Sequence, residues 1–435
     1  MTTLARRLNA FDATMIVMGG IIGSGIFINP YVVARQVHSA PLILGAWAAG
    51  GVIALLGAFV YAELAAIRPE AGGQYAYLRD AYHPAAAFMY GWVLLLVIQS
   101  GGMAAVAVTF ARYTIELTGL PLPDWTIATV TLIVLTLINC LGVRSGSNTQ
   151  SLLMILKLLA IAMLLGAATM FMHKSQLTMH PVVDGGGLLM RFAAAMTPVM
   201  FAYGGWQTAT FMSGELKRPD RDLAIGLVAG VLGVIAIYVG VNVVCLMALG
   251  TKGLAATTTP ASAVMRLAFG ARGGQLIALG IAISTLGFLS QGMLTAPRVY
   301  YAMANDKLFF NAVARVHPTT RVPIVAIALQ GAAAIVIALS GTYEQILGYV
   351  VSSDFLFFGL TGLAVFRFRG RKAAHPIGTV IFVLACWLVV AGTVVAAPLN
   401  SAIGYAILLA GLPAYWFWSH AKSATTAQTH GNNIE

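Results

Sequence analysis

Long apolar stretches fill most of this 435-residue chain. Each has roughly the 20 apolar residues that a helix needs to cross the hydrocarbon core of a bilayer. Charged residues make up only 9% of the chain, and most of them fall between the stretches. The sequence therefore predicts an all-α membrane protein with twelve transmembrane helices, although merged or split neighbours would change the count by one or two. The expected helices lie near residues 12–36, 41–66, 84–112, 125–143, 150–172, 188–213, 223–249, 273–304, 322–341, 346–366, 376–397 and 401–419.

Basic residues indicate how the chain is oriented. If the N-terminus is cytoplasmic, the Lys217 to Arg221 cluster and the basic run from 367 to 372 lie inside, and few Lys or Arg lie outside. Cytoplasmic loops carry such an excess of Lys and Arg. We therefore expect a multi-pass protein of the cytoplasmic membrane, with both termini in the cytoplasm and a disordered tail at 422–435. The net charge of +11 then indicates that the basic residues face anionic lipid headgroups rather than nucleic acid.

Cysteine and histidine positions argue against a disulfide framework or a metal site. Cys140, Cys245 and Cys386 fall within predicted spans, far apart in sequence, and the eight His lie mostly near loops and ends. No ligand spacing results, so we expect neither metal nor cofactor. An intramembrane enzyme is also disfavoured, because no Gly-x-Ser-x-Gly, His-Glu-x-x-His or clustered His occurs at membrane depth.

Glycines interrupt two of the apolar stretches, about half a chain apart. The first interruption is Gly19-Gly20-Ile21-Ile22-Gly23-Ser24-Gly25, and the second is Phe201-Ala202-Tyr203-Gly204-Gly205-Trp206. Lipid tolerates unwound backbone only where protein or water satisfies its polar groups, and a matched pair of broken helices is typical of a transporter's binding site. Close helix packing is the alternative use of such glycines.

The placement of the breaks fits an inverted repeat. We expect discontinuous helices 1 and 6 and a repeat in which five helices are followed by five inverted ones. Repeat one would cover about 12–172 and repeat two about 188–366. Helices 11 and 12, at about 376–419, complete a single transporter domain over residues 1–421.

Broken helices suit a zwitterionic ligand, because an unpaired carboxylate or ammonium would be costly in a low-dielectric site. The positive end of a half-helix dipole favours a carboxylate, and freed carbonyls favour an ammonium. The expected carboxylate donors are the N–H groups around Gly23, Ser24 and Gly25. The expected ammonium acceptors are the carbonyls of Ile21, Phe201, Ala202 and Gly204, within a binding stretch that also includes Tyr203, Gly205 and Trp206.

Five segments, in order along the chain, resemble the amino acid, polyamine and organocation transporter superfamily. They are the Gly-Ser-Gly break, Pro69-Glu70-Ala71-Gly72-Gly73-Gln74-Tyr75-Ala76-Tyr77-Leu78, Gly214-Glu215-Leu216-Lys217-Arg218-Pro219-Asp220-Arg221, Arg298-Val299-Tyr300-Tyr301-Ala302-Met303-Ala304-Asn305-Asp306, and Val316-His317-Pro318 with Pro323. The 201–206 stretch and a lysine on helix 5 are similar to L-type amino acid transporters and their bacterial relatives. The resemblance implies a sodium-symporter-like fold with this inverted repeat, and amino acid transport, commonly by exchange.

The resemblance also bears on partners. Eukaryotic members of the L-type group pair with a glycoprotein through a cysteine in the loop after helix 3. The corresponding loop here, Glu116 to Trp125, contains no cysteine. We therefore expect no disulfide-linked heavy-chain partner, while the oligomeric state stays open.

Lys157 is the one cation left in mid-membrane, and such a charge is functional by default. By resemblance it occupies the place where sodium-coupled relatives hold a sodium ion between helices 1 and 8. Its ammonium would tie carbonyls near Gly20 and Ile21 to Ser284 and Thr285, which predicts no sodium dependence. The alternatives are a lysine that snorkels to the headgroups and one that exchanges a proton.

The remaining candidate residues concern the gate and the side-chain pocket. Phe201 resembles the family's gating aromatic residue, although a Phe is ordinary in such helices. Ser100, Gln207 and Asp354 are expected near the substrate side chain, together with Trp206. Asp354 is the other intramembrane charge. It could shape selectivity, take a proton or be a hydrogen-bonded structural residue.

Three functional hypotheses follow. The first is a secondary transporter of neutral L-amino acids that works by alternating access in sodium-independent exchange. It is favoured because no acidic pair besides Asp354 lies at mid-membrane to hold a cationic side chain. The second is proton-coupled or exchange transport of cationic amino acids or polyamines, with Asp354 pairing the extra charge. The third is of a different class, a substrate-sensing membrane protein or an intramembrane enzyme.

Overall fold

The fold was examined in a computed structural model, and every regular element in the described part of the chain is helical. The described residues are 9–68, 73–141, 147–172, 175, 177, 187–207, 210, 216–315, 317, 322–369 and 374–431. The helices are α1 (Ala10–Ile21), α2 (Gly25–Val37), α3 (Ala40–Ile67), α4 (Gly73–Ala81), α5 (Pro84–Val93), the π-helix η1 (Leu94–Ile98), α6 (Gln99–Thr118), α7 (Asp124–Cys140), α8 (Ser147–Gly166), α9 (Ala168–Phe171), α10 (Leu188–Tyr203), α11 (Pro219–Ala256), α12 (Pro260–Thr295), α13 (Pro297–Asn305), α14 (Ile324–Ser340), α15 (Tyr343–Arg369), α16 (Pro376–Ala396) and α17 (Pro398–Gly431).

Within the described residues, seven helical segments are long and apolar enough to cross a bilayer. The pair α1 and α2 passes the same test together and forms an eighth, broken span with a 46° bend. Four more apolar helices are shorter, namely Asp124–Cys140, Ile155–Phe171, Leu188–Tyr203 and Ile324–Ser340. The chain is therefore a multi-span membrane protein. The count of twelve spans and the inverted repeat stay predictions.

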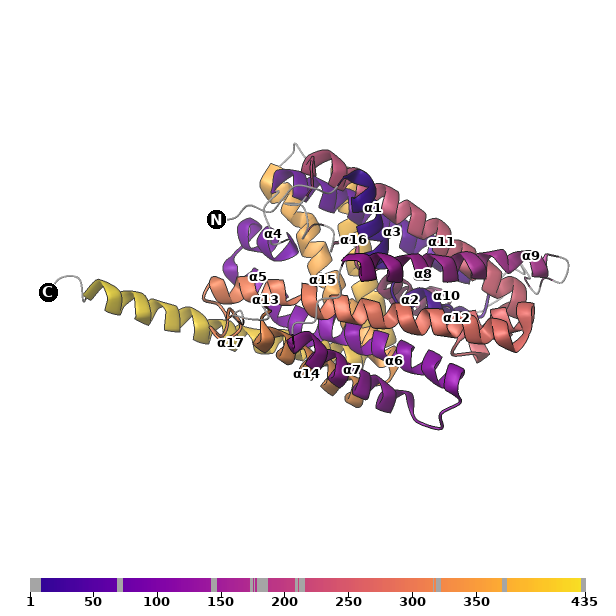
Figure 1. The fold of residues 1–435 in the computed structure, drawn as a ribbon. Helices are drawn as coiled ribbons and strands as arrows, with labels where there is room; N and C mark the ends of the chain where they lie inside the picture. The colour runs from indigo at the N-terminus through magenta and orange to yellow at the C-terminus, as the bar shows by residue number, and fades with distance from the viewer. Residues whose placement is uncertain are drawn as a thin grey trace.

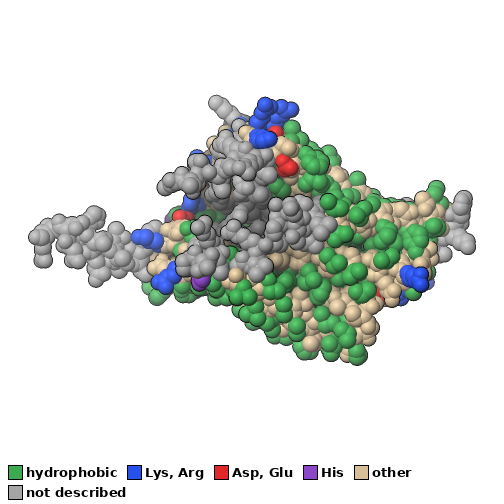
Figure 2. All heavy atoms as spheres, viewed as in Figure 1, with side chains coloured by type: hydrophobic (Ala, Val, Ile, Leu, Met, Phe, Trp, Pro, Cys, Tyr) green, Lys and Arg blue, Asp and Glu red, His purple; other side chains and the backbone are tan. Residues whose placement is uncertain are grey.

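The surface of the molecule supports this conclusion. Large apolar side chains point outward along several helices, including Leu137 on α7, Leu388 on α16 and Trp416 on α17, each at least 60% exposed. Figure 2 shows apolar side chains across the middle of the visible face, with Lys and Arg gathered toward its ends. Water would penalise so much exposed apolar surface, whereas lipid does not.

Most helices run side by side along the long axis of the molecule, with α8 and α12 in front of α2 and α10 (Figure 1). The half-helices α2 and α10 pack against each other, and α11 packs along both α1 and α3. Close approach of α1 to α11 depends on small residues. A Cβ atom added to Gly226 would lie 2.4 Å from the Cβ of Ala13. Small residues at membrane helix interfaces let backbones approach in this way.

The first and last described helices begin and end as follows. The Asn9 side chain accepts hydrogen bonds from the N–H groups of Phe11 and Asp12, and Asp12 bonds back to the Asn9 N–H, so a capping box begins α1. At the other end of the chain, α17 continues to Gly431, whereas the sequence predicted a disordered tail from residue 422. The three Thr, Ser423 and Gly431 in this segment are weak helix formers, so its helical form follows from continuity with the apolar helix before it.

Candidate functional site

Helix 1 is interrupted at Ile22, Gly23 and Ser24. Ile22 ends α1 with non-helical dihedral angles, φ −71° and ψ 81°. The Gly23 N–H then donates to the Ile21 carbonyl over 2.7 Å, which closes a tight turn. The chain bends by 46° before α2 begins at Gly25. The first N–H groups of α2 therefore start a new helix inside the protein, where such groups have no partner within the helix.

Helix 6 loses its regular α-helical form after Tyr203, where α10 ends. Of the rest of this predicted helix, residues 208, 209 and 211–213 lie outside the described residues, so the helix 6 interruption here means the end of α10 and residues 204–207. The last turn of α10 closes where the Gly204 N–H donates to the Met200 carbonyl over 3.0 Å. Gly205 then has φ +112°, which L side chains rarely adopt. Its N–H lies 3.0 Å from Oε1 of Gln207, so the Gln207 side chain caps the break rather than extending away from it.

The two interruptions contact each other. A Cβ atom added to Gly205 would lie only 2.2 Å from the backbone oxygen of Gly20. Likewise, a Cβ atom on Gly25 would lie 2.7 Å from the Cα of Ala202. The glycines that interrupt the two helices are thus the residues that allow their backbones to meet.

Tyr238 on α11 joins the two interruptions through one hydroxyl group. Its oxygen lies 3.0 Å from the carbonyl of Ile21 and 3.1 Å from the carbonyl of Ala202. The side chain is completely buried, and its ring packs against those of Trp47 and Tyr203. Sequence reasoning missed this residue, since a tyrosine in an apolar helix is ordinary.

The Lys157 ammonium points into the protein. It lies 2.5 Å from the carbonyl of Ile22 and 5.6 Å from the centre of the Phe288 ring on α12. The side chain is only 6% exposed. The cation therefore lies at the C-terminal end of α1, where the helix dipole favours positive charge.

Ser284 and Thr285, the partners predicted for Lys157 on α12, lie within one helical turn of Phe288 in sequence. Ser284 and Thr285 are buried, and Ser284 precedes Phe288 by one helical turn. The Thr285 hydroxyl lies 2.9 Å from the carbonyls of Ile281 and Ala282, within its own helix. The described hydrogen bond of Lys157 goes to helix 1. The predicted link from Lys157 to Ser284 and Thr285 stays a prediction.

Several polar groups near the interruptions are left without a hydrogen-bond partner. They include the Ser24 hydroxyl and the indole N–H of Trp206, both completely buried. Phe201 is half-buried beside them on α10. Buried polar groups are usually satisfied, so unused groups at a break are candidates for contact with a ligand.

Ser100 and Asp354 lie on helices that surround the interruptions. The Ser100 hydroxyl lies 2.5 Å from the Leu95 carbonyl, next to the π-helix, and 3.3 Å from the Gln330 carbonyl of α14. These contacts lead away from α1 and α10. Asp354 is buried on α15, whose Phe355 and Phe358 rings pack against Trp206.

The middle of α2 is tied to the start of α15. Asn29 donates to the Pro198 carbonyl over 2.6 Å and accepts from the Tyr343 hydroxyl over 2.8 Å. The Tyr31 hydroxyl donates to Glu344 over 2.8 Å. The half-helices α2 and α10 are therefore fastened to α15 beyond the interruptions.

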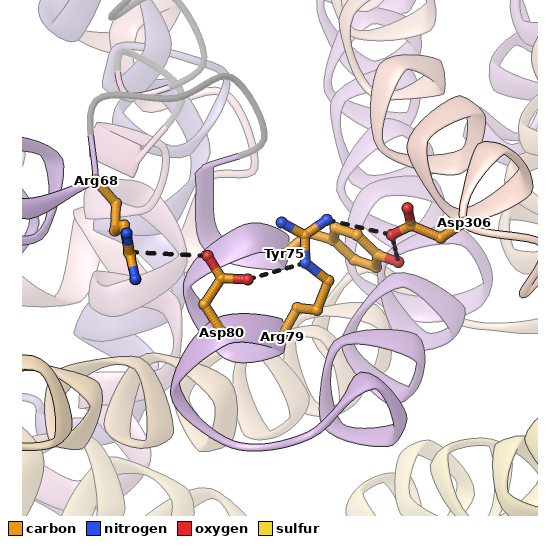
Figure 3. Close-up of polar contacts among 5 residues, drawn as sticks. All are labelled: Arg68, Tyr75, Arg79, Asp80 and Asp306. Carbon is orange, nitrogen blue, oxygen red and sulfur yellow. Dashed lines mark hydrogen bonds and ion pairs between the residues drawn. The ribbon is translucent and has the colours of Figure 1, made fainter.

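At the opposite end of α15, two of the family-like segments meet (Figure 3). The Tyr75 hydroxyl donates to Asp306 over 2.9 Å, and Arg79 pairs with the same carboxylate at 3.3 Å. Burial and the hydrogen bond to Asp306 raise the pKa of the Tyr75 phenol. The rest of the first segment, 69–72, and residues 214–215, 316 and 318 lie outside the described residues.

One half-open cavity of about 410 Å³ lies between α3 and the start of α16. Its walls include Phe59, Glu63 and Ile377, none of which belongs to the interruptions. Glu63 accepts a hydrogen bond from the Ala374 N–H over 2.8 Å and lies 3.7 Å from Arg369. This cavity is separate from the candidate site.

Comparison with known proteins gives a family. The sequence pattern described as amino acid permease matches residues 8–417. The serine/threonine exchanger SteT of Bacillus subtilis (strain 168) is 30% identical over 443 residues, which cover 97% of this chain and 98% of the relative. The human b(0,+)-type amino acid transporter 1 is 27% identical, covering 97% of this chain and 89% of the relative.

A third relative extends this match to the L-type transporters. The human large neutral amino acids transporter small subunit 2 is 27% identical over 445 residues, which cover 96% of this chain and 82% of the relative. The matches run along nearly the whole chain. The chain therefore belongs to the amino acid permease family of the amino acid, polyamine and organocation superfamily, and is a membrane transporter rather than an enzyme.

Proposed function

We propose that this transporter carries neutral L-amino acids across the cytoplasmic membrane by sodium-independent exchange. The observation that carries the proposal is the contact between the two helix interruptions, where Gly205 lies against the Gly20 carbonyl. Main-chain groups of both helices are there within reach of one small zwitterion. A site made of backbone dipoles fits the group that all amino acids share.

The carboxylate would bind at the start of α2. The N–H groups of Ser24 and Gly25 and the unpartnered Ser24 hydroxyl are the donors available there. The positive end of the α2 dipole adds to their attraction for an anion. Gly23 supplies the turn, because its own N–H is used by the Ile21 carbonyl.

The ammonium would bind to carbonyls at the ends of α1 and α10. The single O–H of Tyr238 lies near the carbonyls of both Ile21 and Ala202, and the Ile21 carbonyl also accepts from the Gly23 N–H. The ammonium would therefore take the place of the Tyr238 hydroxyl at Ile21 and bind the second lone pair of the Ala202 carbonyl. The carbonyls of Phe201 and Gly204 complete the acceptor set. Phe201, half-buried beside them, would cover the bound amino acid as a gate.

Lys157 would replace a sodium ion. Its ammonium neutralises the negative end of the α1 dipole at Ile22, and Ser284 and Thr285 would support it from α12. Because this cation is covalently attached, transport should not require a diffusible one. Protein cations at such depth persist only where they have a function.

Alternating access requires the contacts beyond the interruptions to open. With both termini in the cytoplasm, the Asn29 and Tyr343 contact would close the extracellular path. The contact between Tyr75 and Asp306 would lie on the cytoplasmic side. Rocking of α1, α2 and α10 against the surrounding helices would then expose the site to either face.

Neutral substrates and exchange are favoured by two considerations. No carboxylate pair lies near the interruptions among the described residues to hold a cationic side chain. The bacterial relative named above is a serine/threonine exchanger, and one mammalian relative is named for large neutral amino acids. Side-chain selection would fall to Trp206, Gln207 and residues of α15.

Proteoliposomes test the proposal. Vesicles preloaded with one neutral amino acid should take up the same labelled compound with or without sodium, and empty vesicles should take up much less. A competition panel of the twenty amino acids and putrescine would then define the substrate class. Inhibition by arginine or putrescine but not by alanine, serine or leucine would contradict a neutral substrate.

A cationic substrate is the second candidate, because Asp354 is a buried carboxylate without an ion-pair partner among the described residues. In that case Asp354 would pair with the charged side chain of the substrate. The competition panel separates the two candidates directly. A protein that binds amino acids but transports none would instead be a sensor.

A further inference from the structure

Asp354 differs from every other charged group in the protein interior that the structure describes. Its side chain is 9% exposed, and Oδ1 is buried with no hydrogen-bond partner. No ion pair reaches the carboxylate within the described residues. An ionised carboxylate in such surroundings would be strongly unfavourable.

The other three buried charges among the described residues are satisfied. Lys157 has the Ile22 carbonyl and the Phe288 ring. Glu63, buried on α3, has the Ala374 N–H and Arg369. Asp222, in the first turn of α11, accepts a hydrogen bond from the Arg218 N–H. All three therefore have partners for their charged forms. Asp354 has no such partner among the described residues. Its surroundings therefore favour the neutral, protonated form of the carboxyl group.

The neighbours of Asp354 come from helices other than the two broken ones. Tyr61 on α3, Tyr90 on α5 and Cys386 on α16 lie close enough to interact with its carboxylate. All three are buried, and the Tyr61 hydroxyl also lacks a hydrogen-bond partner. A neutral carboxylic acid could share hydrogen bonds with such hydroxyl groups, whereas no side chain that the structure describes beside Asp354 supplies positive charge.

The helices packed around α15 carry further titratable groups among the described residues. The uncharged ones are Tyr75 and Tyr77 on α4, Tyr113 on α6, Tyr203 on α10, Tyr343 and Tyr349 on α15 itself, and Tyr405 and Tyr415 on α17. The charged ones outside α6 and α15, besides Glu63 on α3, are Arg191 on α10, and Arg79 and Asp80 on α4, which pair with each other. The charged residues of α15 lie at its two ends, at Glu344, Arg367 and Arg369. The charged groups described on α6, Arg112 and Glu116, lie toward its C-terminal end, near the start of α15.

Asp354 is nevertheless connected to the candidate site. Phe358 follows it by one helical turn, and the Phe358 ring packs against both Trp206 and Tyr61. Trp206 belongs to the helix 6 interruption. Any motion that separates α10 from α15 therefore changes the packing around Asp354 and its access to water.

We propose that Asp354 is a proton-binding site, and that the loaded carrier crosses the membrane only with this proton bound. The inference rests on the proposed function and adds a coupled ion to it. In exchange the carrier crosses loaded and protonated in both directions, so no net proton moves. During net transport one proton would accompany each amino acid, because the empty carrier would return only after Asp354 has released its proton.

The test is the pH dependence of exchange, measured with the same pH on both sides of the vesicle. Wild-type exchange should fall as the pH rises, by a factor that approaches about tenfold per pH unit once Asp354 loses its proton. Asp354→Asn mimics the protonated acid, so its exchange, whatever the rate, should not fall with pH. Glu63→Gln, at a carboxylate that already has partners, should keep the wild-type profile.

Two results would overturn the proposal: a flat wild-type profile, or an Asp354→Asn profile that still falls with pH. If that variant does not fold, infrared spectroscopy of the wild-type protein replaces it. Most of the 14 Asp and Glu side chains lose their protons at neutral pH. A protonated carboxyl band should persist there and shift in Asp354→Glu, and its absence would refute the proton site. Failure of exchange at every pH would instead refute the proposed function, while the infrared band still tests Asp354.

Discussion

The ammonium of Lys157 lies 2.5 Å from the backbone oxygen of Ile22, where the first half of the broken helix ends. The two residues are 135 positions apart in sequence. A charge-assisted bond of this kind is worth roughly 1.5–3 kcal/mol. It therefore can hold an unwound backbone segment in place during a transport cycle.

Replacing Lys157 by Ala should lower exchange by about tenfold or more, because a loss of roughly 1.4 kcal/mol already changes a rate by this factor. Binding of the substrate should be partly retained, since the proposed ligands are main-chain groups. Initial exchange rates and the substrate-induced shift in melting temperature measure the two effects. If this variant exchanges at the wild-type rate, the remaining interpretation is that the Lys157 side chain only reaches toward the lipid headgroups.

Gly205 and Gly204 provide a matched pair of adjacent substitutions. Gly205→Ala forces an L side chain into φ +112° and against the Gly20 carbonyl, which should cost about 1–3 kcal/mol or more. In Gly204→Ala the added Cβ atom would lie 3.4 Å from the Phe201 carbonyl oxygen and 3.6 Å from that of Met200, both in the preceding helical turn. Thermal unfolding in detergent should therefore show a large loss for Gly205→Ala only.

A bulkier residue at Gly204 tests the site rather than the fold. Gly204→Val should abolish binding, because the side chain would block the approach of the substrate to the main chain. Its melting temperature without substrate should stay near that of Gly204→Ala. Retained binding in Gly204→Val would exclude the Gly204 backbone from the site.

Tyr238→Phe removes the hydroxyl that lies between the Ile21 and Ala202 carbonyls. We expect a loss of about 1 kcal/mol in stability and a lower exchange rate. Tyr300→Phe is the matched control, since the Tyr300 hydroxyl is buried without a partner. An equal effect of both substitutions would show that the position of the Tyr238 hydroxyl does not matter.

Asp306→Asn tests the contact in Figure 3. The substitution keeps an acceptor for Tyr75 but removes the ion pair with Arg79. A partly exposed pair contributes little stability, roughly 0–1 kcal/mol, so the fold should persist. If this contact closes the cytoplasmic path, a cysteine at the interruption should react faster with a thiol reagent in the variant. Unchanged reactivity would show that the contact has no part in closure.

The sequence predicted those features that follow from local chemistry. Glycines within apolar stretches predicted the break between α1 and α2 and the end of α10 at Tyr203, because glycine permits the backbone conformations that a helix lacks. Lys157 was identified as a charge in an otherwise apolar segment. The family match then confirmed the type of protein.

Features that depend on tertiary packing could not be predicted. Tyr238 contacts Ile21 and Ala202, which are 217 and 36 positions away, and nothing local distinguishes it from other tyrosines. Ser100 was expected near the substrate, but its hydrogen bonds go to Leu95 and Gln330 beside a π-helix. A π-helix shifts which residues of the following helix face the interior of the protein. No sequence pattern predicted this π-helix.

The position of the bound amino acid tests the central claim most directly. A structure determined with a saturating transported substrate should show the carboxylate on the N–H groups at the start of α2. It should also show the ammonium on carbonyls at the ends of α1 and α10. A substrate bound elsewhere, with no contact to either interruption, would contradict the account.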